Sequence, residues 1–356
     1  MGQTNRMVTV AAIMITAVFF PAPLSAETWV DPDWPTMVKE AKLIVLVEVV
    51  EGGNFEAKVK AVQALKGEAP KDTFVVEGFN DRYLAKEDIE HGVFKKGQKY
   101  YLFLNESGGA YRTPSPTAGN LLLDDGKVKL SLHFTTWSRY RGTERPADEI
   151  DELLKNAAKF QADGTTDQEF LDSLGKGLDE SLKSDDKAAA PDYFLLAMHL
   201  AGENRYRDSF AKLPEHESMR VRIGLARLLG QVKDERATKL LEKLIVDKDT
   251  HVQGEAVRQY AQGDPDTIAP VLLKALSQAK SGGKGPNELM DPVRNTTFGG
   301  KLEIVRTLGR LKYKPAAKEL LPLLEEDDTM LFVTLQALRN MENKDYLPYF
   351  EKKIRA

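Results

Sequence analysis

The chain has no cysteine among its 356 residues. Disulfides, zinc–thiolate sites, thiol nucleophiles and a lipid-modified N-terminal cysteine are therefore excluded together. The chain also lacks a large excess of either charge, because 50 Lys and Arg stand against 54 Asp and Glu, which gives a formal net charge of -4. Such a chain has no general attraction for a phosphate backbone or an anionic membrane, so we expect no nucleic-acid partner.

Long hydrophobic runs are missing except near the N-terminus. Residues 7–20 carry no charge, follow a short polar segment with one positive charge at Arg6, and precede a segment of mostly small residues that ends at Ala26. The run is shorter than the roughly 20 residues that span a bilayer, and this order is typical of a secretory signal peptide. We predict a signal peptide over residues 1–26 and cleavage before Glu27, with a retained anchor as the alternative. The mature protein is then exported, periplasmic or extracellular, with no transmembrane span after signal removal.

The remaining composition is that of an ordinary globular protein, with 42% hydrophobic and 29% charged residues. At roughly 100 to 200 residues per domain, the length predicts about two folded units. The pattern changes along the chain from alternating, β-branched segments to helical periodicity. We therefore divide the mature chain into a β domain at 27–135, a linker with one helix at 136–165, and a helical domain at 166–356.

Residues 27–135 are predicted to form a small β-barrel. The segment 42–50 is almost continuously apolar, and 55–65 alternates between apolar and polar residues. Further strand candidates lie at 73–76, 99–104, 120–123 and 127–132. Asp125-Gly126 predicts a tight hairpin between the last two, because this pair accepts positive φ angles. Five or six short strands without a crossover helix favour a closed or partly closed antiparallel barrel, with an open sandwich as the alternative.

Three stretches of this domain resemble a known family. They are Leu43-Ile-Val-Leu-Val-Glu-Val-Val50, Ala64-Leu65-Lys66-Gly67 and Phe94-Lys-Lys-Gly-Gln-Lys-Tyr-Tyr-Leu-Phe-Leu104, and they are similar to netrin-like or tissue-inhibitor-of-metalloproteinase-like modules. The resemblance implies an OB-like barrel. The animal inhibitors use an N-terminal cysteine and disulfides, which this chain lacks, so the resemblance implies the fold more than the inhibitory mechanism. It points to the cysteine-free bacterial relatives.

Residues 166–356 are predicted to form a stack of helix pairs. An arginine recurs in the first helix of each pair, at Arg227, Arg258, Arg306 and Arg339, in steps of 31, 48 and 33 residues. Apolar residues three and four apart give each helix one stripe that a single pair cannot bury, so neighbouring pairs must stack. The Val-Arg starts, the Leu-Gly ends and the Asp before the second helix resemble HEAT repeats, particularly the short bacterial type. This resemblance implies an α-solenoid.

The predicted fold class is therefore multidomain, all-β plus all-α: a small antiparallel OB-like β-barrel followed by a HEAT-like α-solenoid. The long step of 48 residues coincides with the stretch 278–295, which we interpret as a loop inserted into the stack. The helix pairs are predicted at 221–230 with 234–245, 252–258 with 268–276, 304–309 with 315–324, and 335–339 with 346–354, with further helices at 148–161, 166–182 and 192–213.

A search for chemistry finds no catalytic or metal-binding constellation in the sequence. His199 with Glu203, and His251 with Glu255, stand four residues apart, but two ligands fall short of a metal site. There is no Gly-x-Ser-x-Gly nucleophile elbow, and the glycine-rich stretch 281–285 lacks the spacing of a phosphate-binding loop. We predict a protein that is not an enzyme and has no cofactor and no bound metal.

Two surfaces are candidates for partner binding. The first lies in the linker and mixes aromatic with cationic side chains, the types that dominate binding hot spots; the alternative is that these rings dock the barrel onto the first helices. The second is the concave side of the solenoid, which the second helices line. The recurrent arginines are interpreted as packing between repeats and pairing with turn carboxylates. The candidate partner-binding residues are Trp137, Arg139, Tyr140, Arg141, Lys239 and Lys243.

The sequence thus predicts an exported, non-enzymatic protein–protein interaction or scaffolding protein, with a protein partner in the bacterial cell envelope. The prediction depends on two folds that commonly bind proteins and on the negative search for catalytic residues. The alternative is a peptidase inhibitor-like protein, or a degenerate protein that acts on peptide or glycan. The barrel's resemblance to metalloproteinase inhibitors motivates that alternative.

Overall fold

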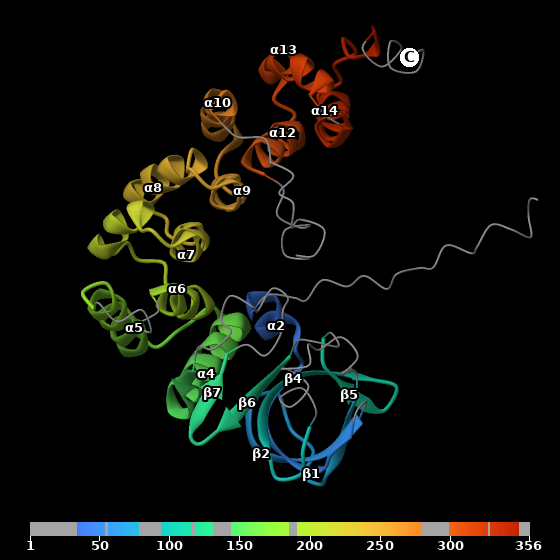
Figure 1. Ribbon diagram of the computed structural model, residues 1–356, viewed down its shortest axis with the longest axis vertical. Coiled ribbons are helices and arrows are strands. Elements are labelled where there is room, and N and C mark those ends of the chain that lie inside the picture. Colours follow the sequence, from blue (N-terminus) through green and yellow to red (C-terminus); the bar gives the residue numbers. More distant parts are fainter. Residues whose placement is uncertain are drawn as a thin grey trace, which may run out of the picture. The chain divides into compact units, whose positions relative to one another are not determined.

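Figure 1 shows the computed structural model of the chain. No helix among the described residues is long and apolar enough to cross a membrane. The predicted signal peptide and nearly all of the predicted inserted loop lie outside the described residues. The structure describes residues 34–53, 56–77, 94–114, 119–130, 144–184, 191–278, 299–326 and 328–348.

Five strands close a barrel in the N-terminal part of the chain (Figure 1). They lie in the order β1-β2-β3-β5-β4, and β4 pairs back with β1, as in an OB-like barrel. The predicted barrel is confirmed, with one correction: β3 and β5 pair in parallel. A closed ring of five strands cannot alternate direction at every contact, so one parallel pair is required. The strands are β1 (Leu43–Glu51), β2 (Glu56–Lys66), β3 (Phe74–Glu77), β4 (Lys99–Ser107) and β5 (Ala110–Arg112).

Three more strands extend the sheet from β4. They are β6 (Asn120–Asp124), β7 (Lys127–Lys129) and β8 (Glu144–Pro146). Asp125 and Gly126 join β6 to β7 with φ angles of 47° and 72°, which confirms the predicted Asp-Gly hairpin. Because β8 pairs with β7, the sheet continues beyond residue 135 into the stretch predicted as a linker.

Strand β1 is apolar over its first five residues, Leu43 to Val47, because both of its faces are buried there. Val45 and Val47 point into the barrel interior, whereas Ile44 and Leu46 belong to a second core outside the barrel. Helices α2 (Trp34–Glu40) and α4 (Ala147–Asp163) cover this outer side and contact β4 and β2.

The second core joins the barrel to the helices. It extends without interruption from Trp34 through Ile150 of α4 to Met341 after the last described helix. The buried Tyr101 of β4 adds a polar tie, because its hydroxyl donates to Asp151 Oδ1 of α4 at 2.8 Å. The barrel and the first helices therefore share one hydrophobic interior.

The helical part is a stack of paired helices, as predicted. The first helices α7, α9, α12 and α14 pack on one another in this order, while α8 contacts both α7 and α9, and α10 contacts α12. The helical elements are α5 (Gln168–Ser181), α6 (Pro191–Leu200), η3 (Asp208–Glu215), α7 (Met219–Leu229), α8 (Glu235–Ile245), α9 (Thr250–Tyr260), α10 (Pro265–Leu276), α12 (Gly300–Arg310), η4 (Lys314–Ala316), α13 (Ala317–Leu320), η5 (Leu321–Glu325) and α14 (Asp328–Asn340).

Capping and proline explain where the second helices begin and break. Asp234 accepts a hydrogen bond from the Arg236 backbone N–H at 2.8 Å and so caps the start of α8. The helix predicted at 315–324 is instead split into η4, α13 and η5. Pro315 and Pro322 stand in the first turns of the two 3-10 segments. Because proline lacks a backbone N–H, the regular α-helical hydrogen bonding is interrupted at each of them.

Candidate interaction surfaces

Four of the six candidate contact residues, Trp137, Arg139, Tyr140 and Arg141, lie outside the described residues. The other two stand on the exposed side of α8. The Lys239 ammonium pairs with Glu235 at 2.6 Å and its side chain is 65% exposed, and Lys243 is exposed one turn further on. The structure thus places both lysines on one helix, on the side opposite its buried leucines.

Two of the four recurrent arginines, Arg227 and Arg258, join consecutive first helices through buried carboxylates. Arg227 Nε of α7 lies 3.4 Å from Glu255 Oε2 of α9, and Arg258 Nη2 lies 2.8 Å from the same atom. Arg258 Nη1 also lies 4.0 Å from Glu303 Oε2 of α12, which Arg306 Nη1 approaches to 3.2 Å. Pairing between repeats is confirmed. The prediction of turn carboxylates is wrong for these contacts, because both partners are helical glutamates.

We call this series of ion pairs between arginines and the buried Glu255 and Glu303 the arginine ladder. It keeps the Glu255 carboxyl ionised. Burial by itself would raise the pKa of its carboxyl, but the charges of Arg227 and Arg258 and a hydrogen bond from Gln259 lower that pKa to about 2. A carboxyl with such a pKa cannot exchange a proton near neutral pH, so Glu255 is not suited to general acid–base chemistry.

In both His–Glu pairs singled out in the sequence, the glutamate is bound by arginines. The Glu203 side chain is fully buried and pairs with Arg205 at 2.9 Å and with Arg207, while Glu255 is bound by arginines as described. His251 Nδ1 lies 3.2 Å from Asp249 Oδ1. Among the residues that the structure describes, no group of three or more His, Asp and Glu could hold a metal ion.

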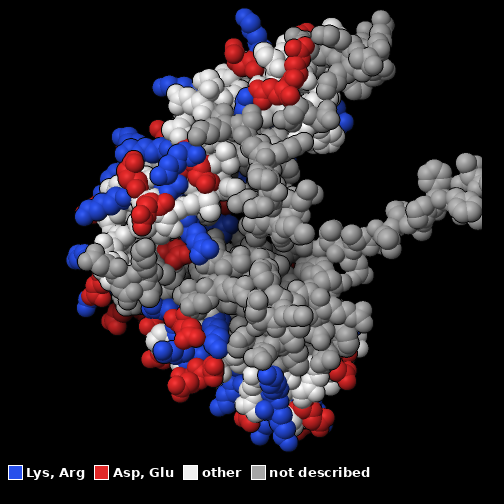
Figure 2. All heavy atoms as spheres, in the orientation of Figure 1, with Lys and Arg blue, Asp and Glu red and all other residues white. Residues whose placement is uncertain are grey.

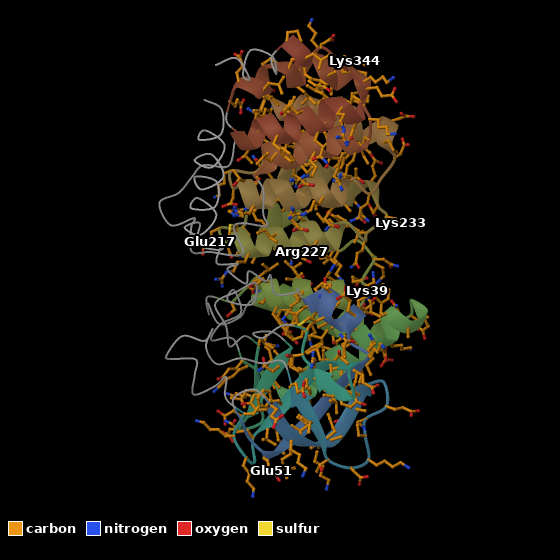
Figure 3. The ribbon with its side chains drawn as sticks, turned by 90° about the vertical axis from the view of Figure 1, so that its right-hand side faces the viewer. Lys39, Glu51, Glu217, Arg227, Lys233 and Lys344 are labelled. Atoms are coloured by element: carbon orange, nitrogen blue, oxygen red, sulfur yellow. The ribbon has the colours of Figure 1, made fainter. Side chains whose placement is uncertain are left out.

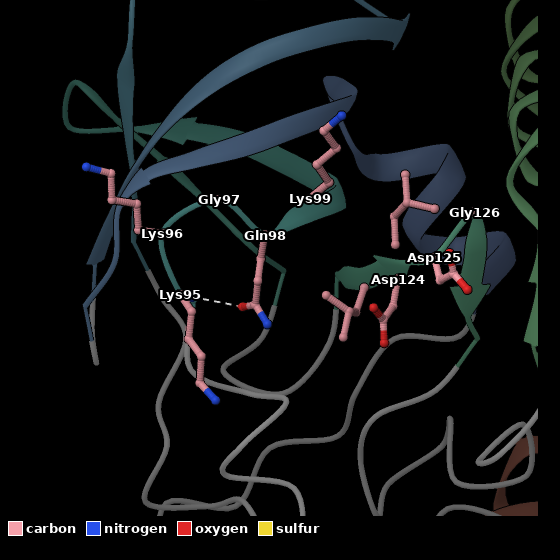
Figure 4. Close-up of a pocket in the computed structure, with 10 residues that line it drawn as sticks. Lys95, Lys96, Gly97, Gln98, Lys99, Asp124, Asp125 and Gly126 are labelled. Atoms are coloured by element: carbon pink, nitrogen blue, oxygen red, sulfur yellow. Dashed lines mark hydrogen bonds between the residues drawn. The ribbon is translucent and has the colours of Figure 1, made fainter.

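An open pocket of about 780 Å³ lies beside the turn before β4 (Figure 4). Gln98 fixes the turn, because its Oε1 accepts from the Lys95 backbone N–H at 2.9 Å and from the Tyr100 hydroxyl at 2.8 Å. The exposed lysines 95, 96 and 99 diverge in Figure 4, and Asp124 of the facing hairpin already pairs with Lys129. The lysines therefore do not converge on one anion.

A second groove, of about 500 Å³, lies along α14 near the C-terminal end of the helical stack. We call it the α14 groove. Phe332 and Leu347, which line it, are 70% and 44% exposed, unusually high for large apolar side chains. Lys344, close to the groove in sequence, marks this end of the stack in Figure 3, whereas Arg227 lies well inside it. The lining residues are Phe332, Leu335, Gln336, Arg339, Tyr346 and Leu347.

Charge elsewhere on the surface is mixed. On the face shown in Figure 2, acidic and basic side chains of the described residues are interspersed over the helical part. The α14 groove differs because it combines exposed apolar side chains with one cation, Arg339.

Sequence reasoning recognised Arg339 but did not find the groove. The signal was available: Glu255 and Glu303 each precede an arginine by three residues, and Gln336 replaces them before Arg339.

The fold defines a class of protein, a closed five-stranded barrel followed by an all-α stack. Neither the family models nor the curated proteins nor the solved structures give a match to this chain. Function must therefore be argued from the surfaces themselves.

Proposed function

We propose that this chain is an exported, non-enzymatic scaffolding protein that binds a protein partner in the bacterial cell envelope. The observation that carries the proposal is the α14 groove, where Phe332, Leu335 and Arg339 combine on one accessible face. Aromatic and arginine side chains around a desolvated apolar centre are typical of protein-binding hot spots. The pairing of the helices supports HEAT-like repeats, and the strand order supports a netrin-like barrel.

Several features support binding over catalysis. The buried Glu203, Glu255 and Glu303 are all engaged by arginines within the stack. The shared core holds the barrel and the first helices together as one scaffold. Trp137, with its cationic and aromatic neighbours in the linker, and Lys239 with Lys243 on α8 remain our further candidates for partner contacts.

Affinity capture tests the proposal. The mature chain, residues 27–356, is immobilised and exposed to envelope extract, with Phe332→Ala as the paired variant. We expect a defined protein to be retained and to be identified by mass spectrometry. Retention of a small molecule, with no macromolecule in repeated experiments, would reject the scaffolding function. Export is tested on the same material, because the N-terminus of the protein from the envelope fraction is expected to be Glu27.

An inhibitor of metalloproteases is a second candidate, supported by the closed OB-like barrel. The full mature chain is assayed against a panel of secreted metalloproteases, because the barrel shares its core with the helices and is not separable on structural grounds. No inhibition at micromolar concentration would remove this candidate.

A further inference from the structure

The α14 groove occupies a definite place in the register of the stack. In α9 and α12, a buried glutamate stands three residues before the recurrent arginine, as Glu255 before Arg258 and Glu303 before Arg306. Two arginines reach forward: Arg227 lies 3.4 Å from Glu255 of the next first helix, and Arg258 lies 4.0 Å from Glu303. The third, Arg306, lies 3.2 Å from Glu303 of its own helix. Each of these three arginines thus meets a buried glutamate, either of its own helix or of the next first helix.

Arg339 differs from these three arginines, because it has no carboxylate partner among the described residues. It holds the same position in α14 as Arg258 in α9, but it is exposed and has no ion-pair or hydrogen-bond partner within the described part of the chain. Its own helix offers Gln336 where α9 and α12 have glutamate. A neighbouring helix with an acidic residue at the corresponding place would supply the carboxylate that pairs with Arg339.

The apolar side chains of the groove also lack a covering helix among the described residues. In α12, Leu302 and Glu303 are 8% and 3% exposed and lie in the packed interior of the stack. The corresponding residues of α14 are Leu335, which is half-buried, and Gln336, which is exposed. Phe332, one turn before, is 70% exposed. Stacked repeats normally end in a polar outer face, so an apolar end face is a feature that needs a covering partner.

The groove also lies where the repeat pattern of the stack would place another helix. Helix α9 packs on both α7 and α8, α12 packs on both α9 and α10, and α14 packs on α12 and on the α13–η5 segment. Each first helix thus rests against both members of the preceding pair. The α14 groove is lined by α14 and by the following Tyr346 and Leu347, which is the equivalent position one step further along the stack.

We propose that the α14 groove docks one amphipathic α-helix of a partner protein, whose carboxylate pairs with Arg339 and whose apolar side chains cover Phe332 and Leu347. The partner helix extends the stack by one member. This inference rests on the proposed scaffolding function and names the chemistry of its partner. A second copy of the chain fits less well, because two α14 ends facing each other bring two Arg339 side chains together, and the groove lining contains no acidic residue.

The chain itself supplies a probe. Residues 299–312 contain α12, which occupies the equivalent seat against α9 and α10 and carries Glu303. A fluorescent peptide of this sequence is held helical by a staple that replaces Arg306 and Arg310, four residues apart. The staple removes the two arginines that pair with Glu303 inside α12, so that Glu303 is free to reach Arg339. Circular dichroism confirms the helicity before use, because short isolated helices are marginal in water.

Binding of this peptide to the full mature chain is measured by fluorescence anisotropy. We expect saturable binding that Phe332→Ala and Arg339→Gln each weaken about tenfold or more. The peptide with Glu303→Gln should bind as weakly to the wild type as to Arg339→Gln, which is the signature of a direct pair in a double-mutant cycle. Val246→Ala removes an exposed apolar side chain elsewhere (42% exposed) and Lys233→Gln removes an exposed cation; both should leave the affinity unchanged.

Several outcomes overturn the proposal. The first is that the helical peptide shows no saturable binding up to about 0.5 mM. The second is peptide binding that neither groove variant weakens. The third is self-association of the mature chain in sedimentation that Phe332→Ala abolishes. Binding that appears only after deletion of residues 349–356 assigns the groove to the chain itself and also rejects a partner. If envelope capture succeeds equally with wild type and Phe332→Ala, the scaffolding function stands and the groove is rejected. If the peptide binds but capture fails, the groove chemistry stands and the envelope partner is rejected.

Discussion

The sharpest test of the arginine ladder is to remove the charge of Glu255 while keeping its shape. In Glu255→Gln the side chain remains buried, and Arg227 and Arg258 lose their shared carboxylate. Both arginines are only partly exposed, 20% and 31%, so water replaces the lost partner incompletely. We expect the variant to fold with the same helix packing and with lower stability.

The magnitude follows from the pKa of the Glu255 carboxyl. It is about 2 in the folded protein, against an ordinary value of 4.5. This difference corresponds to about 3 kcal/mol of folding free energy that depends on the ionised form. Glutamine resembles the neutral carboxyl, so Glu255→Gln should lower the free energy of unfolding by about 3 kcal/mol at neutral pH, which agrees with the cost of breaking other buried ion pairs.

The dependence on pH has a definite sign. Because the folded-state pKa is depressed, the stabilising contribution of Glu255 is fully present above about pH 4.5 and is lost as the pH falls toward about 2. The gap between wild type and Glu255→Gln should therefore be constant from pH 7 to pH 5. At pH 3.5 it should be smaller by about 1 kcal/mol.

Urea denaturation, followed by circular dichroism at each pH, measures this gap. The matched control is Glu235→Gln, which removes a carboxylate from an exposed pair with Lys239 and should change stability far less than Glu255→Gln does. Equal stability of Glu255→Gln and wild type at pH 7, or a gap that widens on acidification, would refute the reasoning.

Three further changes test the fold around the candidate surfaces, each by urea denaturation. Tyr101→Phe removes the hydroxyl bonded to Asp151 at 2.8 Å and should cost about 1 kcal/mol; an unchanged midpoint would show that this tie between barrel and α4 contributes nothing. Gly309→Ala should lower stability by about 1 to 3 kcal/mol despite the better helix propensity of alanine, because the new Cβ would lie 2.6 Å from the α14 backbone. The control is Gly224→Ala, whose new Cβ would have its nearest atom at 3.3 Å and which should be close to neutral. Gly126→Ala meets no atom within 4 Å but must adopt a φ of 72°, so it should cost about 1 kcal/mol, and a stabilised variant would contradict the hairpin geometry.

Local sequence patterns predicted the elements well where one physical signal dominated. The alternation in 55–65 became β2, with Ala57 and Val59 buried and Lys58 and Lys60 exposed. The Asp-Gly pair became a two-residue turn. The Asp residues before the second helices became N-caps, as Asp264 shows by accepting from the Thr267 N–H. These features depend on neighbours within a few residues, which the sequence displays directly.

Strand β5 was missed because its signals are weak on their own. Ala110–Arg112 is three residues long and follows two glycines with positive φ, and it belongs to none of the strands predicted from the sequence. Its conformation is fixed by pairing with Ser107 in β4 and with Val76 in β3, which lies more than thirty residues earlier. Such pairing over long sequence distances decides short strands, and no local pattern records it.

The sequence by itself determined the two kinds of architecture, the repeat period near thirty residues and the recurrence of Arg227, Arg258, Arg306 and Arg339. Only the tertiary structure decided that the barrel closes through a parallel pair, that helical glutamates are the partners of the first three arginines, and that Arg339 stands beside an open apolar groove. The physical reason is the same in each case. Periodicity states which face of an element is apolar, but which element covers that face, and which charge meets which, depends on packing between distant segments.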